Sequence, residues 1–131
     1  MENCIFCRIV AGVKPAHRIW ESEDFLAFLS IHPCNPGHTC LIPKIHIEYV
    51  FDLEDRLYSR IFLAAKQLSK PIKAATNANR IGIAVEGFSV PHVHLHLVPL
   101  YKMASLIHID ISNKPLASSQ KWLMTSERRW R

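Results

Sequence analysis

The sequence predicts a single α+β domain in which an amphipathic helix lies on an antiparallel sheet, and three observations support this prediction. The chain has 131 residues, of which 49% are apolar, enough for one hydrophobic core but not for two. Several short aliphatic and aromatic runs are bounded by turns that contain proline or glycine, as strands are. One longer segment repeats apolar residues at the spacing of a helix.

Strands are predicted at 17–21, 25–30, 39–42, 81–85 and 92–98, because each of these runs is apolar or alternating and ends at a turn. The loop at 32–38 contains Pro33, Pro36 and Gly37, which separate the second run from the third. The turn-like segment 86–89 joins the last two runs. They are therefore expected to form an antiparallel meander.

The main helix is expected to begin at Leu53, with Asp52 as its cap and acidic residues in its first turn. Pro71 is expected to end or kink it near Ser69 and Lys70, because proline lacks the backbone N–H that helices need. A short C-terminal helix is predicted from Ser118 or Ser119. The apolar face of the main helix consists of Leu53, Leu57, Ile61, Ala64, Ala65 and Leu68.

Composition and charge bear on the location of the protein and on its partners. No apolar run approaches the roughly 20 residues that span a bilayer, and the N-terminus lacks a signal segment. A cytoplasmic protein is therefore expected, with its four cysteines reduced. The net charge is +5, and several basic residues lie at the C-terminal end. They indicate a solvated tail more than a nucleic-acid or membrane surface, since no stacking aromatic motif accompanies them.

The most informative run is 92–98, in which His92, His94 and His96 alternate with apolar residues. On a strand all three imidazoles would share one face. Residues two apart lie roughly 6.6–6.8 Å from each other and the outer pair about 13 Å apart. One zinc ion can bridge neighbours but hardly all three, so the histidines are expected to have separate roles. The alternative, a histidine-rich core strand, would require a partner for every ring.

With its surroundings, this run resembles the histidine triad (HIT) superfamily, in its bacterial Hint-like branch. The resemblance extends from Cys4 to about Tyr101 and leaves 102–131 poorly matched, within one domain over 1–131. It implies an α+β, HIT-like fold with a five-stranded antiparallel sheet and homodimers that share a longer sheet. The motifs that carry it are Cys4-Ile5-Phe6-Cys7-Arg8-Ile9-Val10, Gly37-His38-Thr39, Ile42-Pro43-Lys44 with His46, and Ser89-Val90-Pro91 before the triad.

The resemblance also implies a reaction at the α-phosphate of a nucleotide, with a purine nucleotide as the expected substrate. His94 matches the family nucleophile, and imidazole is a competent nucleophile near neutral pH. Its other ring nitrogen should donate to a backbone carbonyl. His96 would bind the phosphate oxygens, and Ser89 the phosphate or leaving group. His38 is interpreted as structural. The expected nucleotide-binding residues are Ile5, Phe6, Leu26, Ser30, Ser89 and His96.

A structural zinc site is the second constellation. Cys4 and Cys7 have the spacing of a thiolate pair, which is weak evidence alone because free buried thiols are common. Family members that carry such a pair complete it with the equivalents of His46 and His92. The resemblance therefore implies a closed Cys₂His₂ site whose zinc takes no part in the chemistry.

Two departures from the family pattern bear on activity. Ser30 stands where most Hint-like members carry an aspartate that receives the ribose hydroxyls, a loss of about 1–2 kcal/mol in binding. The segment 85–89 is shorter than the usual loop, and Glu86 would repel phosphate if it pointed inward. The first hypothesis is a nucleotide hydrolase or nucleotidyl transferase that forms a covalent intermediate on His94. The alternatives are a zinc-stabilised nucleotide-binding or interaction module with little turnover and, third, a metalloenzyme whose triad holds a catalytic ion.

Overall fold

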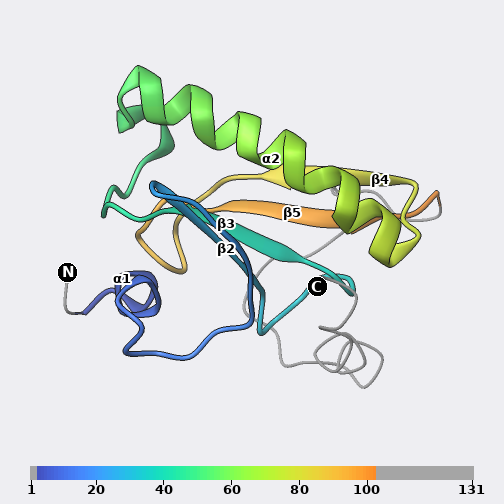
Figure 1. Ribbon diagram of the computed structural model, residues 1–131, viewed down its shortest axis with the longest axis horizontal. Coiled ribbons are helices and arrows are strands. Elements are labelled where there is room, and N and C mark those ends of the chain that lie inside the picture. The colour runs from blue at the N-terminus through green and yellow to red at the C-terminus, as the bar shows by residue number, and fades with distance from the viewer. Residues whose placement is uncertain (1–2, 103–131) are drawn as a thin grey trace.

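The computed structural model describes residues 3–102. They form a five-stranded sheet in the order β1-β2-β3-β5-β4, and every neighbouring pair is antiparallel. Figure 1 shows α2 across one face of the sheet and α1 on the opposite side. The predicted fold class is confirmed. The elements are α1 (Ile5–Val10), β1 (Arg18–Glu21), β2 (Phe25–Leu29), β3 (Thr39–Pro43), the 3₁₀ turn η1 (Val50–Asp52), α2 (Asp55–Thr76), β4 (Arg80–Ala84) and β5 (Leu95–Leu100).

The strand order places β5 inside the sheet rather than at its edge. Cys40 of β3 and Ala84 of β4 both lie opposite His96. The last two strands are antiparallel neighbours, as predicted, but β3 pairs with β5 and not with β4, so the meander is interrupted. Because both sides of β5 are hydrogen-bonded, the backbone that carries His96 is held more firmly than an edge strand would be.

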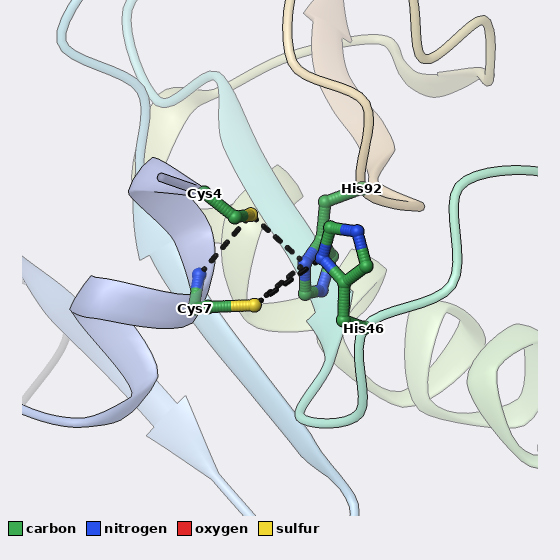
Figure 2. A group of neighbouring side chains, drawn as sticks. All are labelled: Cys4, Cys7, His46 and His92. Atoms are coloured by element: carbon green, nitrogen blue, oxygen red, sulfur yellow. Dashed lines mark hydrogen bonds between the residues drawn. The ribbon is translucent and has the colours of Figure 1, made fainter. Parts of the chain in front are cut away.

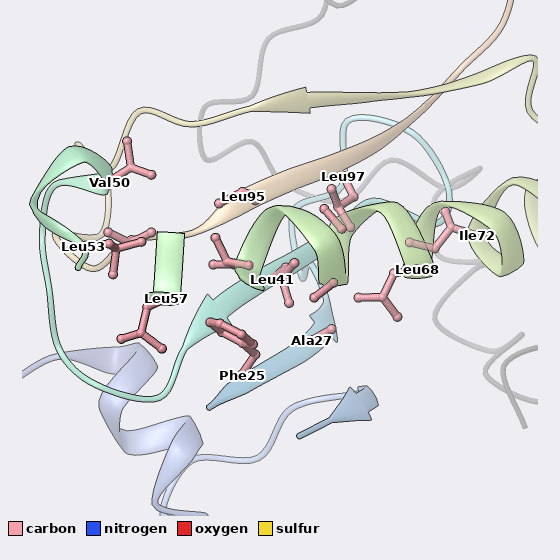
Figure 3. Packing of buried hydrophobic residues seen from close by; sticks show 14 residues of the cluster. Phe25, Ala27, Leu41, Val50, Leu53, Leu57, Leu68, Ile72, Leu95 and Leu97 are labelled. Atoms are coloured by element: carbon pink, nitrogen blue, oxygen red, sulfur yellow. The ribbon is translucent and has the colours of Figure 1, made fainter. Parts of the chain in front are cut away.

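The larger core lies between α2 and the sheet (Figure 3). Ile61 and Ile72 of α2 are fully buried, as are Leu95 and Leu97 of β5. Complete burial of one such side chain contributes about 1.5–3 kcal/mol. The predicted apolar face of the helix is confirmed, because Leu57, Ile61, Ala64, Ala65 and Leu68 all belong to this core.

A second, smaller core lies on the other face of the sheet. Successive residues of β2 point to opposite faces, so Phe25 and Ala27 meet α2 whereas Leu26 and Phe28 pack with Phe6 of α1. Helix α1 was not predicted. Its six residues are too few for a helical repeat to show in the sequence, and its N-cap is Cys4, whose Sγ accepts the Cys7 amide at 3.4 Å.

Both predicted ends of the main helix were wrong. The helix begins at Asp55 rather than Leu53, because Asp52 is taken into η1. It continues through Pro71 to Thr76 rather than stopping near Ser69. A proline in a helix interior costs about 3 kcal/mol, but Ile72 beyond it is fully buried in the larger core. That burial and the remaining helical turn offset the loss.

The triad segment also differs from the prediction. Strand β5 starts at Leu95, so His92 and His94 precede the strand instead of belonging to it. The amide of Val93 donates to the carbonyl of Ile47 at 2.7 Å rather than to β3. The predicted alternation survives, because Val93, Leu95 and Leu97 enter the larger core.

Over residues 3–102, no helix combines the length and the apolar character that a membrane crossing requires. The predicted helix from Ser118 or Ser119 lies outside the described residues.

Candidate functional site

A cavity lies on the α1 side of the sheet and collects most of the residues expected to act together. His94, His96 and Ser89 line it, as do Ile5, Phe6 and Ser30. Leu26, expected to wall the nucleotide pocket, does not line it, because its side chain is fully buried in the smaller core. The wall also contains Ile9, Lys14, Pro15, Ala16, Phe28, Leu29, Ile31, His32, His38, Cys40 and Val90.

A backbone hydrogen bond determines which nitrogen of His94 carries the proton. Nδ1 lies 2.7 Å from the carbonyl oxygen of His92. A carbonyl can only accept, so Nδ1 is protonated and donates, and Nε2 keeps its lone pair. The Phe6 ring meets the His94 ring edge-on at a centroid distance of 5.0 Å. In its neutral form His94 therefore has a fixed orientation, with its lone pair on Nε2.

The proton of His96 is placed by a chain of two hydrogen bonds. The backbone N–H of Cys34 donates to His38 Nδ1 at 3.1 Å. The proton of His38 must then be on Nε2, which lies 2.8 Å from His96 Nδ1 and donates to it. His96 therefore carries its own proton on Nε2. This nitrogen is buried and has no partner among the described residues, so it is a donor available to a ligand in the cavity.

The loop before β3 positions His38. Gly37 has a φ of 90°, and a Cβ at this position would collide with the side chain of Thr76. Only glycine fits such a site without strain. The loop is also held to β5, because Asn35 Nδ2 donates to the carbonyl of Pro99 at 2.7 Å. The motif Gly37-His38-Thr39 thus delivers a histidine to the hydrogen-bond chain, a role beyond the structural one expected.

Burial favours the neutral forms of His38, His94 and His96. It lowers the pKa of His38 to about 3, and His96 and His94 nearby act in the same direction. Burial likewise lowers the pKa of His96 to about 4, with His94 as the second cause. The pKa of His94 is lowered by burial, although the His92 carbonyl and the carboxylate of Glu86 oppose the shift. Glu86 is itself exposed.

The predicted zinc ligands come together, with their ligand atoms all within 4.8 Å of one another (Figure 2). Cys4 Sγ lies 3.4 Å from His92 Nδ1, and Cys7 Sγ lies 3.3 Å from His46 Nδ1 and 3.6 Å from His92 Nδ1. Tetrahedral zinc with Zn–S near 2.3 Å and Zn–N near 2.0–2.1 Å sets its sulfur and nitrogen ligands about 3.5 Å apart. The separations fit that geometry.

Proton placement in this group also fits a metal. His92 Nε2 donates to the carbonyl of Pro43 at 2.9 Å, which leaves Nδ1 unprotonated toward the two sulfurs. Burial and the adjacent Cys4 raise the pKa of Cys7, and a bound cation is what makes two neighbouring thiolates tolerable. The same His92 supplies the carbonyl that orients His94. His92 thus connects the group of predicted zinc ligands to His94 of the cavity wall through one hydrogen bond.

A second group of side chains that could coordinate a metal ion lies in the cavity wall. It consists of His38, Cys40 and His96. Its hydrogen bonds argue against a metal. Both ring nitrogens of His38 are engaged, and a metal on Nε2 would require a proton on Nδ1, which faces the N–H of Cys34. Burial also raises the pKa of the Cys40 thiol to about 12. The hydrogen bonds therefore argue against an ion held by His38, Cys40 and His96 together.

Sequence reasoning missed several cavity residues, notably Lys14, His32 and Cys40. Lys14 and His32 lie in loops, where no periodicity marks the direction of a side chain. Cys40 looked like an ordinary apolar strand residue. Its place in the cavity follows from the pairing of β3 with β5, which the sequence did not predict. In that pairing Cys40 lies opposite His96.

The fold and the site define a small α+β domain with a pair of oriented imidazoles in a cavity on its sheet. Residues 11–103 match the HIT domain family model. The chain therefore belongs to the histidine triad family.

Individual relatives agree with this assignment. Over 106 residues the chain is 40% identical to protein hit of Bacillus subtilis. This alignment covers 76% of this chain and 72% of the relative. The chain is 35% identical over 97 residues to adenosine 5′-monophosphoramidase of Saccharomyces cerevisiae, covering 73% of this chain and 61% of the relative. A zinc-bound histidine triad protein of Mycobacterium smegmatis superposes with a TM-score of 0.78 at 27% identity, covering 98% of this chain and 94% of that one.

The buried neutral histidines predict that stability falls on acidification. The pKa values of His38 and His96, about 3 and about 4, lie below the value of about 6.5 for an unfolded chain. Their contribution is therefore complete above pH 6.5 and is lost as the pH falls toward 4, by about 1.4 kcal/mol per pH unit for each histidine. Urea denaturation from pH 8 to pH 5 should show a plateau above pH 6.5 and this slope below it.

The His38→Gln variant removes one of these two histidines and with it the hydrogen bond to the other. Below pH 6.5, the free energy of unfolding of the variant should fall less steeply with decreasing pH than that of the wild type, by about 1.4 kcal/mol per pH unit. Equal slopes in the two proteins would contradict the assignment.

Proposed function

We propose that the protein is a nucleotide hydrolase or nucleotidyl transferase that acts at the α-phosphate of a nucleoside monophosphate ester, phosphoramidate or anhydride. The observation that carries the proposal is the adjacency of an unprotonated His94 Nε2 and a protonated His96 Nε2 in one cavity, with ring centroids 4.6 Å apart. Similarity to a yeast adenosine 5′-monophosphoramidase supports an adenosine phosphoramidate as the first substrate to test.

In the first step, His94 Nε2 attacks the α-phosphorus, the nitrogen–phosphorus bond forms, and the bond to the leaving group breaks. The imidazole of the intermediate is cationic, because Nε2 carries the nucleotidyl group while Nδ1 keeps its proton. The carbonyl of His92, 2.7 Å from Nδ1, stabilises that charge. Water then attacks the phosphorus: the new oxygen–phosphorus bond forms, the nitrogen–phosphorus bond breaks, the proton of the water is released to solvent, and His94 returns to its neutral form.

His96 contributes a hydrogen bond to the phosphate. Its Nε2–H donates to a non-bridging oxygen, and the bond strengthens as negative charge develops in the transition state. Because His96 Nδ1 accepts from His38, the donor is oriented before the substrate arrives. A departing amine gains its proton from solvent water, and the hydroxyl of Ser89, which lines the same cavity, can hydrogen-bond the bridging nitrogen.

We further propose that Cys4, Cys7, His46 and His92 hold a structural zinc ion, which would fix α1 to the segment before β5. The ligand spacing and the zinc-bound relative from M. smegmatis support this. His92 would then transmit its rigidity to His94 through the carbonyl.

A second candidate, a nucleotide-binding module with little turnover, is favoured by one observation. No carboxylate is present among the described residues that line the cavity, so the usual receptor for ribose hydroxyls is missing. Tight binding of AMP without hydrolysis of any phosphoramidate or dinucleoside polyphosphate would identify this alternative.

A cytoplasmic homodimer completes the proposal. Strand β4 is an edge of the sheet, and its Ile83 is 43% exposed. An unpaired apolar edge of this kind is suited to pairing with a second copy.

Loss of the nucleophile should abolish turnover. We expect His94→Asn to hydrolyse adenosine phosphoramidate at least about a thousandfold more slowly than the wild type, because the covalent route is closed. Mass spectrometry of the quenched wild-type reaction should find an adenylated peptide containing His94. Retained turnover in a folded His94→Asn protein would rule out the mechanism.

Metal analysis tests the zinc proposal. The wild type should contain one zinc per chain, whereas Cys7→Ser and His46→Ala should lose the metal and melt at lower temperature. Cys34→Ser changes a thiol outside the ligand group and should keep the zinc. Unchanged zinc content in both ligand variants would refute the assignment.

A further inference from the structure

One part of the cavity wall has an unexpected charge. Lys14 lines the cavity, no aspartate or glutamate does so among the described residues, and Lys14 forms no ion pair with a described acidic residue. Its backbone is fixed at the end of α1, because the Lys14 amide donates to the carbonyl of Arg8 at 3.2 Å. The wall therefore presents a cation without a balancing carboxylate.

Ser30, in the same wall, is already occupied by the protein. Its Oγ accepts the backbone N–H of His32 at 3.2 Å. One lone pair of this oxygen is thus used internally. A neutral hydroxyl with one lone pair occupied is a weaker receptor for the hydroxyls of a ribose than a carboxylate would be.

His32 completes this part of the wall. Its Nδ1 is buried and has no partner among the described residues, and the residue lines the cavity. Buried polar nitrogens are nearly always hydrogen-bonded in folded proteins, to the protein itself, to water or to a ligand. A ligand that brought phosphate oxygens to this wall would supply an acceptor for the tautomer of His32 that carries its proton on Nδ1.

This wall lies next to the phosphate position. The Ser30 amide donates at 2.9 Å to the carbonyl of His38, whose ring is bonded to His96. With the α-phosphate at His94 and His96, we place the attached ribose against the segment 30–32, which lines the same cavity as Lys14.

We infer that the preferred ligands are nucleotides whose ribose carries a second phosphate, at the 2′ or 3′ oxygen, with Lys14 as its counter-charge and His32 as an additional partner. This inference rests on the proposed function, because it takes the position of the α-phosphate from it. A neutral ribose diol finds no carboxylate in this wall. A phosphate on the ribose would instead be attracted by the ammonium group of Lys14.

Calorimetric titration of the full chain with AMP, adenosine 2′,5′-bisphosphate and adenosine 3′,5′-bisphosphate tests the inference. At least one bisphosphate should bind about tenfold more tightly than AMP, as expected for one charge-assisted contact. Lys14→Ala should bring this ratio close to one, and Lys14→Arg should preserve it. Ser30→Asp should reverse the preference, because it adds a negative charge at the wall.

Lys66→Ala is the matched control, since it removes the same charge from an exposed position of α2 that does not line the cavity. It should retain the wild-type ratio. A wild-type ratio of one or below, or equal ratios in Lys14→Ala and Lys66→Ala, overturns the inference. If AMP binds and phosphoramidate is hydrolysed while the ratio is one, only this inference fails. If no nucleotide binds, the proposed function fails with it.

Discussion

The hydrogen bond from His94 Nδ1 to the carbonyl of His92 determines what the cavity can do. Without it, the imidazole could carry its proton on either nitrogen, and the one that faces the substrate would not be reliably nucleophilic. The bond also joins two parts of the molecule. His92 approaches the sulfurs of Cys4 and Cys7 with its ring and orients His94 with its backbone. A disturbance of the metal-ligand group is therefore expected to reach the reacting nitrogen through a single residue.

His96 depends on the same kind of control, exerted through His38. A backbone N–H fixes the proton of His38, and His38 fixes the proton of His96. Two neighbouring rings consequently present opposite properties to one ligand, a lone pair and an N–H. Burial strengthens the arrangement, since it lowers the pKa of each ring and keeps both neutral at physiological pH. The fold supports this with β5, which is paired on both sides, and with a core on each face of the sheet.

Much of this arrangement could be predicted from the sequence, because alternation and helical spacing report directly on burial. Val93, Leu95 and Leu97 entered the larger core as their pattern indicated. The C-terminal end of the helix could not be predicted. The local rule that proline ends a helix was outweighed at Pro71 by the burial of Ile72 against residues far away in the sequence. The partner of His38 was equally hidden, since a separation of 58 residues along the chain leaves no local trace. Lys14 and His32 reach the cavity from loops, where sequence patterns do not specify direction.

The positions of the ring protons are the central claim, and nitrogen-15 NMR of histidine-labelled protein at pH 7.5 measures them directly. Long-range proton–nitrogen correlations distinguish protonated from unprotonated ring nitrogens. We expect His94 to be protonated at Nδ1 only and His96 at Nε2 only, both in the neutral state. A His94 ring protonated at Nε2, or a His96 ring protonated at both nitrogens, would contradict the account.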